Sequence, residues 1–310
     1  MADREIYQWM NDLESVYKQL VTQHSMGMTF EARPMNYLKI SKPSPSAKKI
    51  IWMDCGIHAR EWITPAFCQW FVKEIVQNHQ HDPKIQMLLE NVDVYVLPVY
   101  NVDGYVYSWT TDRLWRKSTA PQYNGTCLGT DLNRNFDIMW GSVDVASNCS
   151  SEEFCGTKPA SEPETKAVVN FVKSKKSQII CYLSIHSFGQ VILIPYGYSG
   201  KLSRNYREMM DIAVKAAAAL KQKHGTEYKV GPFYSTLYPA TGTSQDWVYD
   251  QGVDFAFTLE LRDKGKYGFE LPEDQIQPTC EEAVAAVMTI MRCVTEKKFP
   301  STEPMTTFST

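Results

Sequence analysis

Several features are missing from this 310-residue sequence, and each absence narrows the class of protein. No apolar run approaches the roughly 20 residues that a membrane-spanning helix needs. No basic stripe could neutralise a phosphate backbone, and the net charge is −3, so we expect no nucleic-acid partner. Internal repeats and low-complexity segments are also absent. What remains is the pattern of an ordinary globular chain.

None of the eight cysteines forms a CxxC pair. A thiolate zinc site or a thioredoxin-type redox centre is therefore not expected. Cys127 and Cys149 lie in a polar, turn-rich stretch that also holds Asn-x-Ser/Thr sequons at Asn124 and Asn148. Disulfides and N-glycosylation belong to oxidising compartments, so this stretch indicates an extracellular or secretory protein. Residues 1–4 lack the apolar core of a signal peptide.

Apolar runs of strand length alternate with helical patterns along the chain. Strands are predicted at 50–53, 92–99, 179–185, 191–194 and 255–261, and helices at 66–76, 209–220 and 281–294. Near the N-terminus, one helical face joins Ile6, Met10, Leu13, Tyr17 and Leu20. This alternation predicts an α/β sandwich with a largely buried, mixed sheet.

No linker divides the chain, so we expect one domain over residues 1–298 and a disordered tail over 299–310. Within the domain, residues 110–161 show weak periodicity and many Asn, Gly, Ser and Cys residues. A loop of this length inside a compact domain is usually functional, and a disulfide would hold it in place.

His58 and Glu61 stand three residues apart, shortly after the apolar run at 50–53. Open α/β sheets bind ligands at the carboxyl ends of their strands, and both residue types suit zinc. The pair alone is a weak signal, because a loop histidine and a solvated acid would give the same pattern. His186 ends the run at 179–185, either as a third ligand or as a core histidine bonded to a carbonyl. Two histidines and one glutamate would leave one zinc position open, which is the catalytic arrangement.

Glu260 interrupts the apolar stretch at 257–261. A carboxylate in such surroundings costs free energy unless it is paired or its pKa is raised. A raised pKa is what a general base requires. The other interpretation is a buried ion pair with Arg262, which strand alternation places on the same face.

Four blocks of the sequence resemble the signature segments of the pancreatic-type zinc carboxypeptidases, the A/B family. They are HAREW at 58–62, DLNRN at 131–135, LSIHS at 183–187 and LELRD at 259–263. The match runs in order from about residue 4 to residue 298, and its details are most similar to the carboxypeptidase O branch. The resemblance implies a single-domain α/β/α sandwich around a mixed, mostly eight-stranded twisted sheet, with no pro-domain in this chain.

The resemblance also implies a role for each matched residue. One zinc ion would be held by His58, Glu61 and His186. Asp131 matches the carboxylate that orients the first histidine, Glu260 the general base, and Arg116 the residue that stabilises the oxyanion. Substrate binding is implied for Arg60, Asn133, Arg134, Ser187, Tyr238 and Phe269. The implied reaction is zinc-dependent removal of the last residue of peptides and proteins by a monomeric enzyme.

Among the positions that depart from the family pattern, two bear on specificity and on the disulfides. Gln245 stands at the base of the specificity pocket, where relatives carry an aliphatic residue, Asp or, in the O branch, Arg. Glutamine is neutral, with one acceptor and two donors, so we predict a broad or polar-neutral preference. Gly141 replaces a cysteine of the B and O relatives, which would leave Cys155 free. The bridges then expected are Cys55–Cys68 and Cys127–Cys149, with Cys181, Cys280 and Cys293 as buried or isolated thiols.

Two other functions compete with an active exopeptidase. The first is a catalytically idle, extracellular binding module on the same fold, which would need neither Glu260 nor Arg116. The second is an intracellular glutamate-trimming peptidase, against which the sequons and the close A/B-type blocks argue. Carboxypeptidase O relatives can carry a lipid-anchor signal, but no hydrophobic tail follows residues 306–308, so possible membrane anchoring is not encoded in this chain.

Overall fold

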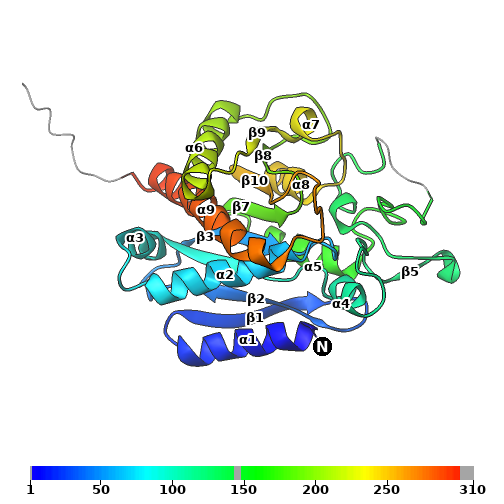
Figure 1. The fold of residues 1–310 in the computed structure, drawn as a ribbon, viewed down its shortest axis with the longest axis horizontal. Helices are drawn as coiled ribbons and strands as arrows, with labels where there is room; N and C mark the ends of the chain where they lie inside the picture. The colour runs from blue at the N-terminus through cyan, green and yellow to red at the C-terminus, as the bar shows by residue number, and fades with distance from the viewer. Residues whose placement is uncertain (1, 143–147, 301–310) are drawn as a thin grey trace, which may run out of the picture.

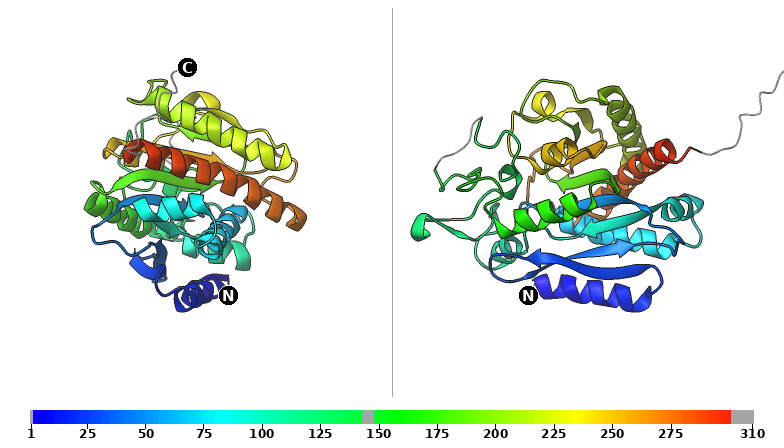
Figure 2. Two further views of the ribbon diagram at one scale, coloured as in Figure 1. Left: turned by 90° about the vertical axis from the view of Figure 1, so that its left-hand side faces the viewer. Right: turned by 180° about the vertical axis from the view of Figure 1, so that it is seen from behind.

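A computed structural model describes residues 2–142 and 148–300. Most of the tail predicted to be disordered, residues 301–310, lies outside the described residues. The described part forms three layers, with a twisted sheet in the middle and helices on both of its faces (Figures 1 and 2). This arrangement confirms the predicted single-domain α/β/α sandwich.

The central sheet has eight strands in the order β1-β2-β4-β3-β7-β10-β8-β9. Their bounds are β1 Val21–Met28, β2 Pro34–Ile40, β3 Lys49–Cys55, β4 Val92–Leu97, β7 Ile179–His186, β8 Val191–Ile194, β9 Lys229–Pro232 and β10 Phe255–Glu260. The pairs β3–β4, β3–β7, β7–β10 and β8–β9 are parallel, and the other three are antiparallel. A separate two-stranded sheet pairs β5 Pro121–Gln122 with β6 Cys127–Leu128. The sheet is therefore mixed, as predicted.

The helices cover the sheet and complete the core. They are α1 Ala2–Val16, α2 Ile63–Asn78, α3 Pro83–Asn91, α4 Val102–Thr110, α5 Pro163–Lys175, α6 Tyr206–His224, α7 Phe233–Thr236, α8 Ser244–Asp250 and α9 Ile276–Lys298. Three short 3₁₀ turns are η1 Tyr123–Gly125, η2 Leu132–Arg134 and η3 Glu273–Gln275. Helix α9 packs against α2, α3 and α6, whereas α5 contacts β1 and α8 contacts β7 and β10.

Three neighbouring parallel strands, β3, β7 and β10, decide where functional side chains can gather. Every residue of β7 and β10 is buried, which explains their continuous apolar sequence. Cys55 at the end of β3 pairs with Ile185, and Glu260 at the end of β10 pairs with His186. The carboxyl ends of the three strands therefore meet at one edge of the sheet, where such folds bind their ligands.

The N-terminal segment differs from its predicted structure. The helical face was expected to reach Leu20, but α1 ends at Val16 and β1 begins at Val21. A turn in which the Leu20 N–H donates to the Tyr17 carbonyl joins them, so both residues pack on the core from outside the helix. Strand β1 is an edge strand with only its first residue fully buried, and its sequence therefore lacks an apolar run.

Two disulfides hold the segments around the carboxyl edge of the sheet. Cys55–Cys68 ties the end of β3 to α2, and Cys127–Cys149 closes part of the long loop between α4 and α5. Both are the expected bridges, and Cys155 and the other three remaining cysteines are free and buried. The sequon residues Asn124 and Asn148 lie on the exposed surface of this loop.

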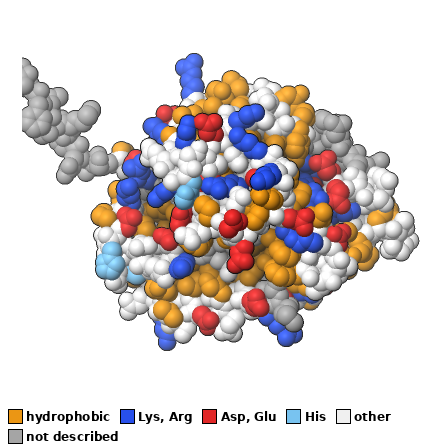
Figure 3. Space-filling view, in the orientation of Figure 1, with side chains coloured by type: hydrophobic (Ala, Val, Ile, Leu, Met, Phe, Trp, Pro, Cys, Tyr) orange, Lys and Arg blue, Asp and Glu red, His pale blue; other side chains and the backbone are white. Residues whose placement is uncertain are grey.

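The surface carries no large patch of one charge on the face drawn in Figure 3, where acidic and basic side chains are interspersed. None of the described helices combines the length and the apolar character that crossing a membrane requires.

A buried carboxyl group in the first turn of α5 makes stability depend on pH. Glu164 accepts a hydrogen bond from the Phe30 N–H at 2.9 Å, but its second oxygen is buried and has no hydrogen-bond partner among the described residues. Burial raises the pKa of Glu164 to about 7, and the nearby carboxylates of Glu162 and Asp103 add to the effect. The pKa of Glu164 in the folded protein lies above its unfolded value of 4.5. The contribution of this group to stability is therefore fully present below pH 4.5 and is lost as the pH rises through about 7.

We therefore expect Glu164→Gln to increase the free energy of unfolding at pH 8 by about 1–3 kcal/mol, with little change at pH 5. Denaturant unfolding of both proteins at the two pH values measures this difference. An equal change at pH 5 and pH 8 would show that ionisation of Glu164 is not the cause.

Candidate active site

Three buried side chains with metal-ligating atoms meet at the carboxyl edge of the sheet. His58 and Glu61 belong to the turn between β3 and α2, and His186 is the last residue of β7. Their candidate ligand atoms all lie within 4.8 Å of one another. Glu61 is central, because its Oε1 lies 2.8 Å from His58 Nδ1 and its Oε2 lies 3.3 Å from His186 Nδ1. The structure thus brings together the three residues that the sequence analysis selected.

Each histidine is oriented by an oxygen atom on its other side. His58 Nε2 lies 3.1 Å from Oδ1 of Asp131, as expected from the family pattern. His186 Nε2 lies 3.1 Å from Oγ of Ser184, which donates a hydrogen bond to the fully buried Asp54. Ring orientation by a second partner is a regular feature of metal-binding histidines.

These residues fit a zinc ion. Two imidazole nitrogens and a carboxylate are zinc ligands, and three protein ligands leave a position open for catalysis. Both Nδ1 atoms face the shared carboxylate, and His186 Nδ1 is buried without a well-formed hydrogen bond. Nearby histidines lower the pKa of Glu61 strongly despite the opposing effect of burial, so it is ionised and ready to bind a cation. Within the described residues, no other group of three His, Cys, Asp or Glu side chains converges in this way.

Glu260 ends β10 beside the histidine that ends β7, and it lines the same cavity. Burial raises the pKa of Glu260 to about 7. The alternative pairing with Arg262 is not found, because Arg262 binds Glu282 at 2.5 and 2.8 Å. No hydrogen bond or ion pair to a described residue engages the Glu260 carboxyl group. It is therefore the carboxyl group of the site that is available for proton transfer.

Arg116 is buried and binds Asp131 in a two-pronged ion pair. Its Nε and Nη2 atoms donate to Oδ2 of Asp131 at 2.9 and 2.8 Å. Burial opposes ionisation of Asp131, but Arg116 and His58 outweigh it and keep its pKa well below the usual range. The pair fixes the guanidinium, and its Nη1 group has no partner among the described residues.

Arg134, Asn133 and Tyr238 also line this cavity, which has a volume of about 370 Å³. Asn133 Oδ1 accepts from the Ser244 N–H at 2.9 Å, which leaves the Asn133 NH₂ group as a donor. Arg134 is buried, whereas Tyr238 is 41% exposed on the loop after α7. The Tyr238 hydroxyl lies 3.5 Å from Arg134 Nη2. The Arg134 guanidinium and the Asn133 amide are two hydrogen-bond donors, and Tyr238 is an exposed aromatic residue on a loop. This combination suits the binding of a carboxylate.

Arg60, Phe269 and Ser187 are also among the residues that line the cavity. The Arg60 guanidinium stacks on the Phe269 ring at 4.2 Å. Ser187 donates its backbone N–H to Glu61 Oε2, and its hydroxyl is buried without a partner. Every catalytic and substrate-binding residue named from the sequence therefore lines this one cavity, with Gln245 as the exception.

Gln245 is held inside the protein. It lies in α8, is 1% exposed, and is not among the residues that line the cavity. Its Nε2 donates to the carbonyls of Leu193 and Ala256, and its Oε1 accepts from the Thr258 hydroxyl. The side-chain amide is therefore fully used inside the protein.

The sequence analysis missed two kinds of residue at the site. Asp54 and Ser184 support His186 from inside the sheet, and the pattern Ser184-x-His186 on one strand face could have suggested the serine. Glu152 and Glu153 come from the long loop and bind Arg60 and Arg134 at 3.0 and 2.9 Å. No local pattern places a loop carboxylate against a distant arginine.

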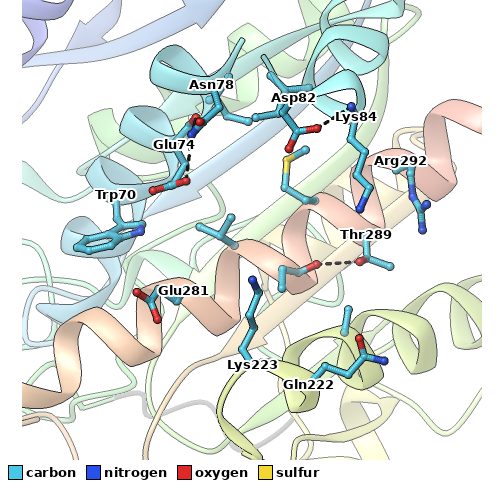
Figure 4. A pocket seen from close by; sticks show the side chains of 16 residues that line it. Trp70, Glu74, Asn78, Asp82, Lys84, Gln222, Lys223, Glu281, Thr289 and Arg292 are labelled. Carbon is cyan, nitrogen blue, oxygen red and sulfur yellow. Dashed lines mark hydrogen bonds between the residues drawn. The ribbon is translucent and has the colours of Figure 1, made fainter. Parts of the chain in front are cut away.

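A larger groove of about 700 Å³ lies between α2, α3, α6 and α9. Its side chains carry both signs of charge, with the acids Glu74, Asp82 and Glu281 and the bases Lys84, Lys223 and Arg292 in its lining (Figure 4). It contains neither the histidine–glutamate group nor Glu260, and we assign no chemistry to it.

Comparison with known proteins agrees with this geometry. The family model described as zinc carboxypeptidase matches residues 6–286. Human carboxypeptidase O is 59% identical over 297 residues, which are 96% of this chain and 79% of that protein. Bovine carboxypeptidase B is 48% identical over 288 residues, 93% of this chain and 69% of that protein.

The solved structures give the same result. Bovine thrombin-activatable fibrinolysis inhibitor, in complex with tick carboxypeptidase inhibitor, superposes with a TM-score of 0.90 at 43% identity. The match covers 95% of this chain and 97% of that one. The fold, the convergent histidine–glutamate group and these matches lead to one assignment: the chain belongs to the zinc carboxypeptidase family and is a metallocarboxypeptidase.

Proposed function

We propose that the protein is an exopeptidase that hydrolyses the C-terminal peptide bond of peptides and proteins, with one zinc ion per chain. The observation that carries the proposal is a single cavity lined by the metal-ligating group, an unpaired carboxyl group and a set of fixed arginines. His58, Glu61 and His186 would hold the zinc. When bound there, zinc supplies Lewis-acid polarisation and makes water more acidic.

Glu260 acts as the general base in this proposal. A carboxyl group with a pKa near 7 can take a proton from the attacking water and return it to the departing amine. Arg116 stabilises the developing oxyanion, since Asp131 fixes the guanidinium and leaves Nη1 unpaired. An idle binding module would require neither group, so their presence in the cavity supports an enzyme.

Recognition of a free C-terminus is assigned to Arg134, Asn133 and Tyr238. A guanidinium binds a carboxylate through parallel hydrogen bonds, and the Asn133 NH₂ group adds a neutral donor. Tyr238 stands on an exposed loop position from which it can close over a bound peptide. Arg60, Ser187 and Phe269 would contact the peptide upstream of the cleaved bond.

Cleavage of a chromogenic peptide with a free C-terminus tests the proposal. Activity should disappear in the presence of a zinc chelator and return when zinc is added. A folded, zinc-loaded protein that cleaves no such peptide would exclude the enzyme and favour the binding module.

The two disulfides and the exposed sequons support an extracellular or secretory location. Asn124 and Asn148 are the proposed glycosylation sites. The catalytic domain is proposed to comprise residues 1–298 and to act as a monomer.

We also propose that the specificity pocket is neutral. Because the amide of Gln245 is bonded to Leu193, Ala256 and Thr258, it offers no free polar group and no charge to a substrate side chain. We expect kcat/KM for C-terminal Phe, Leu, Gln, Arg and Glu to lie within roughly a hundredfold, about 2.7 kcal/mol. A complete series of C-terminal residues on one peptide measures this range. Discrimination beyond a hundredfold in favour of Arg or Glu would contradict a neutral pocket.

The variant Gln245→Leu separates the structural role of this side chain from recognition. It removes one hydrogen-bond donor from each of two buried carbonyls and the acceptor of the Thr258 hydroxyl, which should cost about 1–3 kcal/mol of stability. The order of preferred C-terminal residues should not change. A reordered series would show that the amide contacts the substrate.

A further inference from the structure

Glu152 and Glu153 are two loop carboxylates at the mouth of the active-site cavity. The loop that carries them is fixed at both sides of the pair. Cys149 is bridged to Cys127, and the Phe154 carbonyl accepts from the Asp131 N–H at 2.8 Å. The two acids are therefore held close to the metal-ligating group, although they lie far from it in the sequence.

Glu153 binds the arginine that we assign to the substrate's terminal carboxylate. Its Oε1 accepts from Arg134 Nη2 at 2.9 Å, and the Tyr238 hydroxyl lies 3.5 Å from the same nitrogen. Arg134 Nη1 is used by the Asn133 carbonyl at 3.0 Å. Both Nη groups of this cavity-lining guanidinium are thus already engaged, and Nη2 is held by a carboxylate of the protein.

The two partners differ in their exposure. The Arg134 side chain is 7% exposed, whereas the Glu153 side chain is 45% exposed. A peptide carboxylate that enters the cavity needs the same Nη2 donor, and two carboxylates on one guanidinium edge repel each other. Glu153 can turn into solvent at a small cost, because a half-exposed ion pair contributes little free energy. Arg134 has no such freedom.

We propose that Glu153 is a resident competitor for the C-terminal carboxylate. It neutralises and orients Arg134 in the free enzyme, and an incoming substrate displaces it. This inference rests on the proposed function of Arg134. Glu153 consequently weakens the binding of substrates and of the released amino acid, since both carry the carboxylate that it mimics.

The test compares wild-type enzyme with Glu153→Gln and Glu152→Gln. The two variants change the net charge equally, and both altered residues lie at the same cavity, but only Glu153 contacts Arg134. The probe is 3-phenylpropanoate, measured as a competitive inhibitor of peptide hydrolysis. Its neutral amide, 3-phenylpropanamide, serves as the ligand control.

We expect Glu153→Gln to lower the inhibition constant of the propanoate about three- to fivefold, the size of a partly exposed ion pair. The inhibition constant of the amide should stay the same, and the effect of Glu152→Gln on the propanoate should be less than half as large. KM for a short peptide should fall together with the propanoate constant.

Three results would overturn the role of Glu153. They are an unchanged or higher propanoate constant in Glu153→Gln, an equal fall in Glu152→Gln, and an equal fall for the amide. The second would indicate a general field effect, and the third a change in the shape of the cavity. Wild-type enzyme that hydrolyses no peptide would instead refute the proposed function itself.

Discussion

Replacing Glu260 by Gln is expected to lower kcat by about 10³- to 10⁴-fold. The amide keeps the shape of the side chain but cannot accept a proton from water. Glu260 has no ion-pair or hydrogen-bond partner among the described residues, so the substitution breaks no contact that holds the fold. Zinc content and the melting temperature should therefore stay close to those of the wild-type enzyme. Steady-state kinetics on a chromogenic C-terminal peptide, with metal analysis of the same samples, measures both expectations.

The matched control is Glu227→Gln, the same chemical change at an exposed residue that pairs with Lys221 outside the cavity. Its kcat should remain within twofold of the wild-type value. If Glu260→Gln kept more than a tenth of the wild-type kcat with zinc bound, Glu260 could not be the general base. Loss of zinc in the same variant would point to a role in holding the metal site.

The central part of the fold could be predicted because its strands are buried on both faces. Strands β3, β7 and β10 are short apolar runs, and each is followed or ended by a polar residue at the edge of the sheet. That combination predicted both the α/β fold class and the location of the candidate active site. Strands β1 and β2, at one side of the sheet, were missed, because their partly exposed residues leave too little apolar pattern to be recognised.

The candidate site also has residues whose placement could be predicted from the sequence and residues whose placement could not. His58, Glu61, His186 and Glu260 stand at or just beyond strand ends, so their convergence follows from parallel neighbours in the sheet. The partners that surround them depend on contacts between distant segments. Glu153 reaches Arg134 only because a disulfide and a backbone hydrogen bond position its loop.

The environment of Gln245 could not be predicted for a related reason. The sequence shows a neutral side chain with three hydrogen-bonding groups but not the direction in which they point. Carbonyl oxygens of β8 and β10 accept hydrogen bonds from the Gln245 NH₂ group, and a hydroxyl of β10 donates to its amide oxygen. The side chain that the sequence analysis selected for substrate recognition thus links helix α8 to the sheet.

The second large effect is expected from His186→Ala. Removing one of three ligands should reduce bound zinc from one equivalent to less than about a tenth of an equivalent after dialysis, and activity should fall at least about 10³-fold. His224→Ala is the control. Because His224 pairs with Glu281 away from the cavity, this variant protein should keep its zinc. An active, zinc-free His186→Ala protein, or one that keeps a full equivalent, would contradict the assigned ligand set.

Loss of the residue behind the ligand should have a smaller and separable effect. Ser184→Ala removes the oxygen that lies 3.1 Å from His186 Nε2 but leaves all three ligands in place. Second partners of this kind typically change metal affinity by about 10- to 100-fold, so zinc should still bind when supplied in excess. Asp131→Asn is a less clean probe, because it also leaves the buried Arg116 without its anionic partner. Zinc affinity should decrease in the order wild type, Ser184→Ala, His186→Ala. The size of each step reports how much of the affinity comes from the ligands themselves and how much from their orientation.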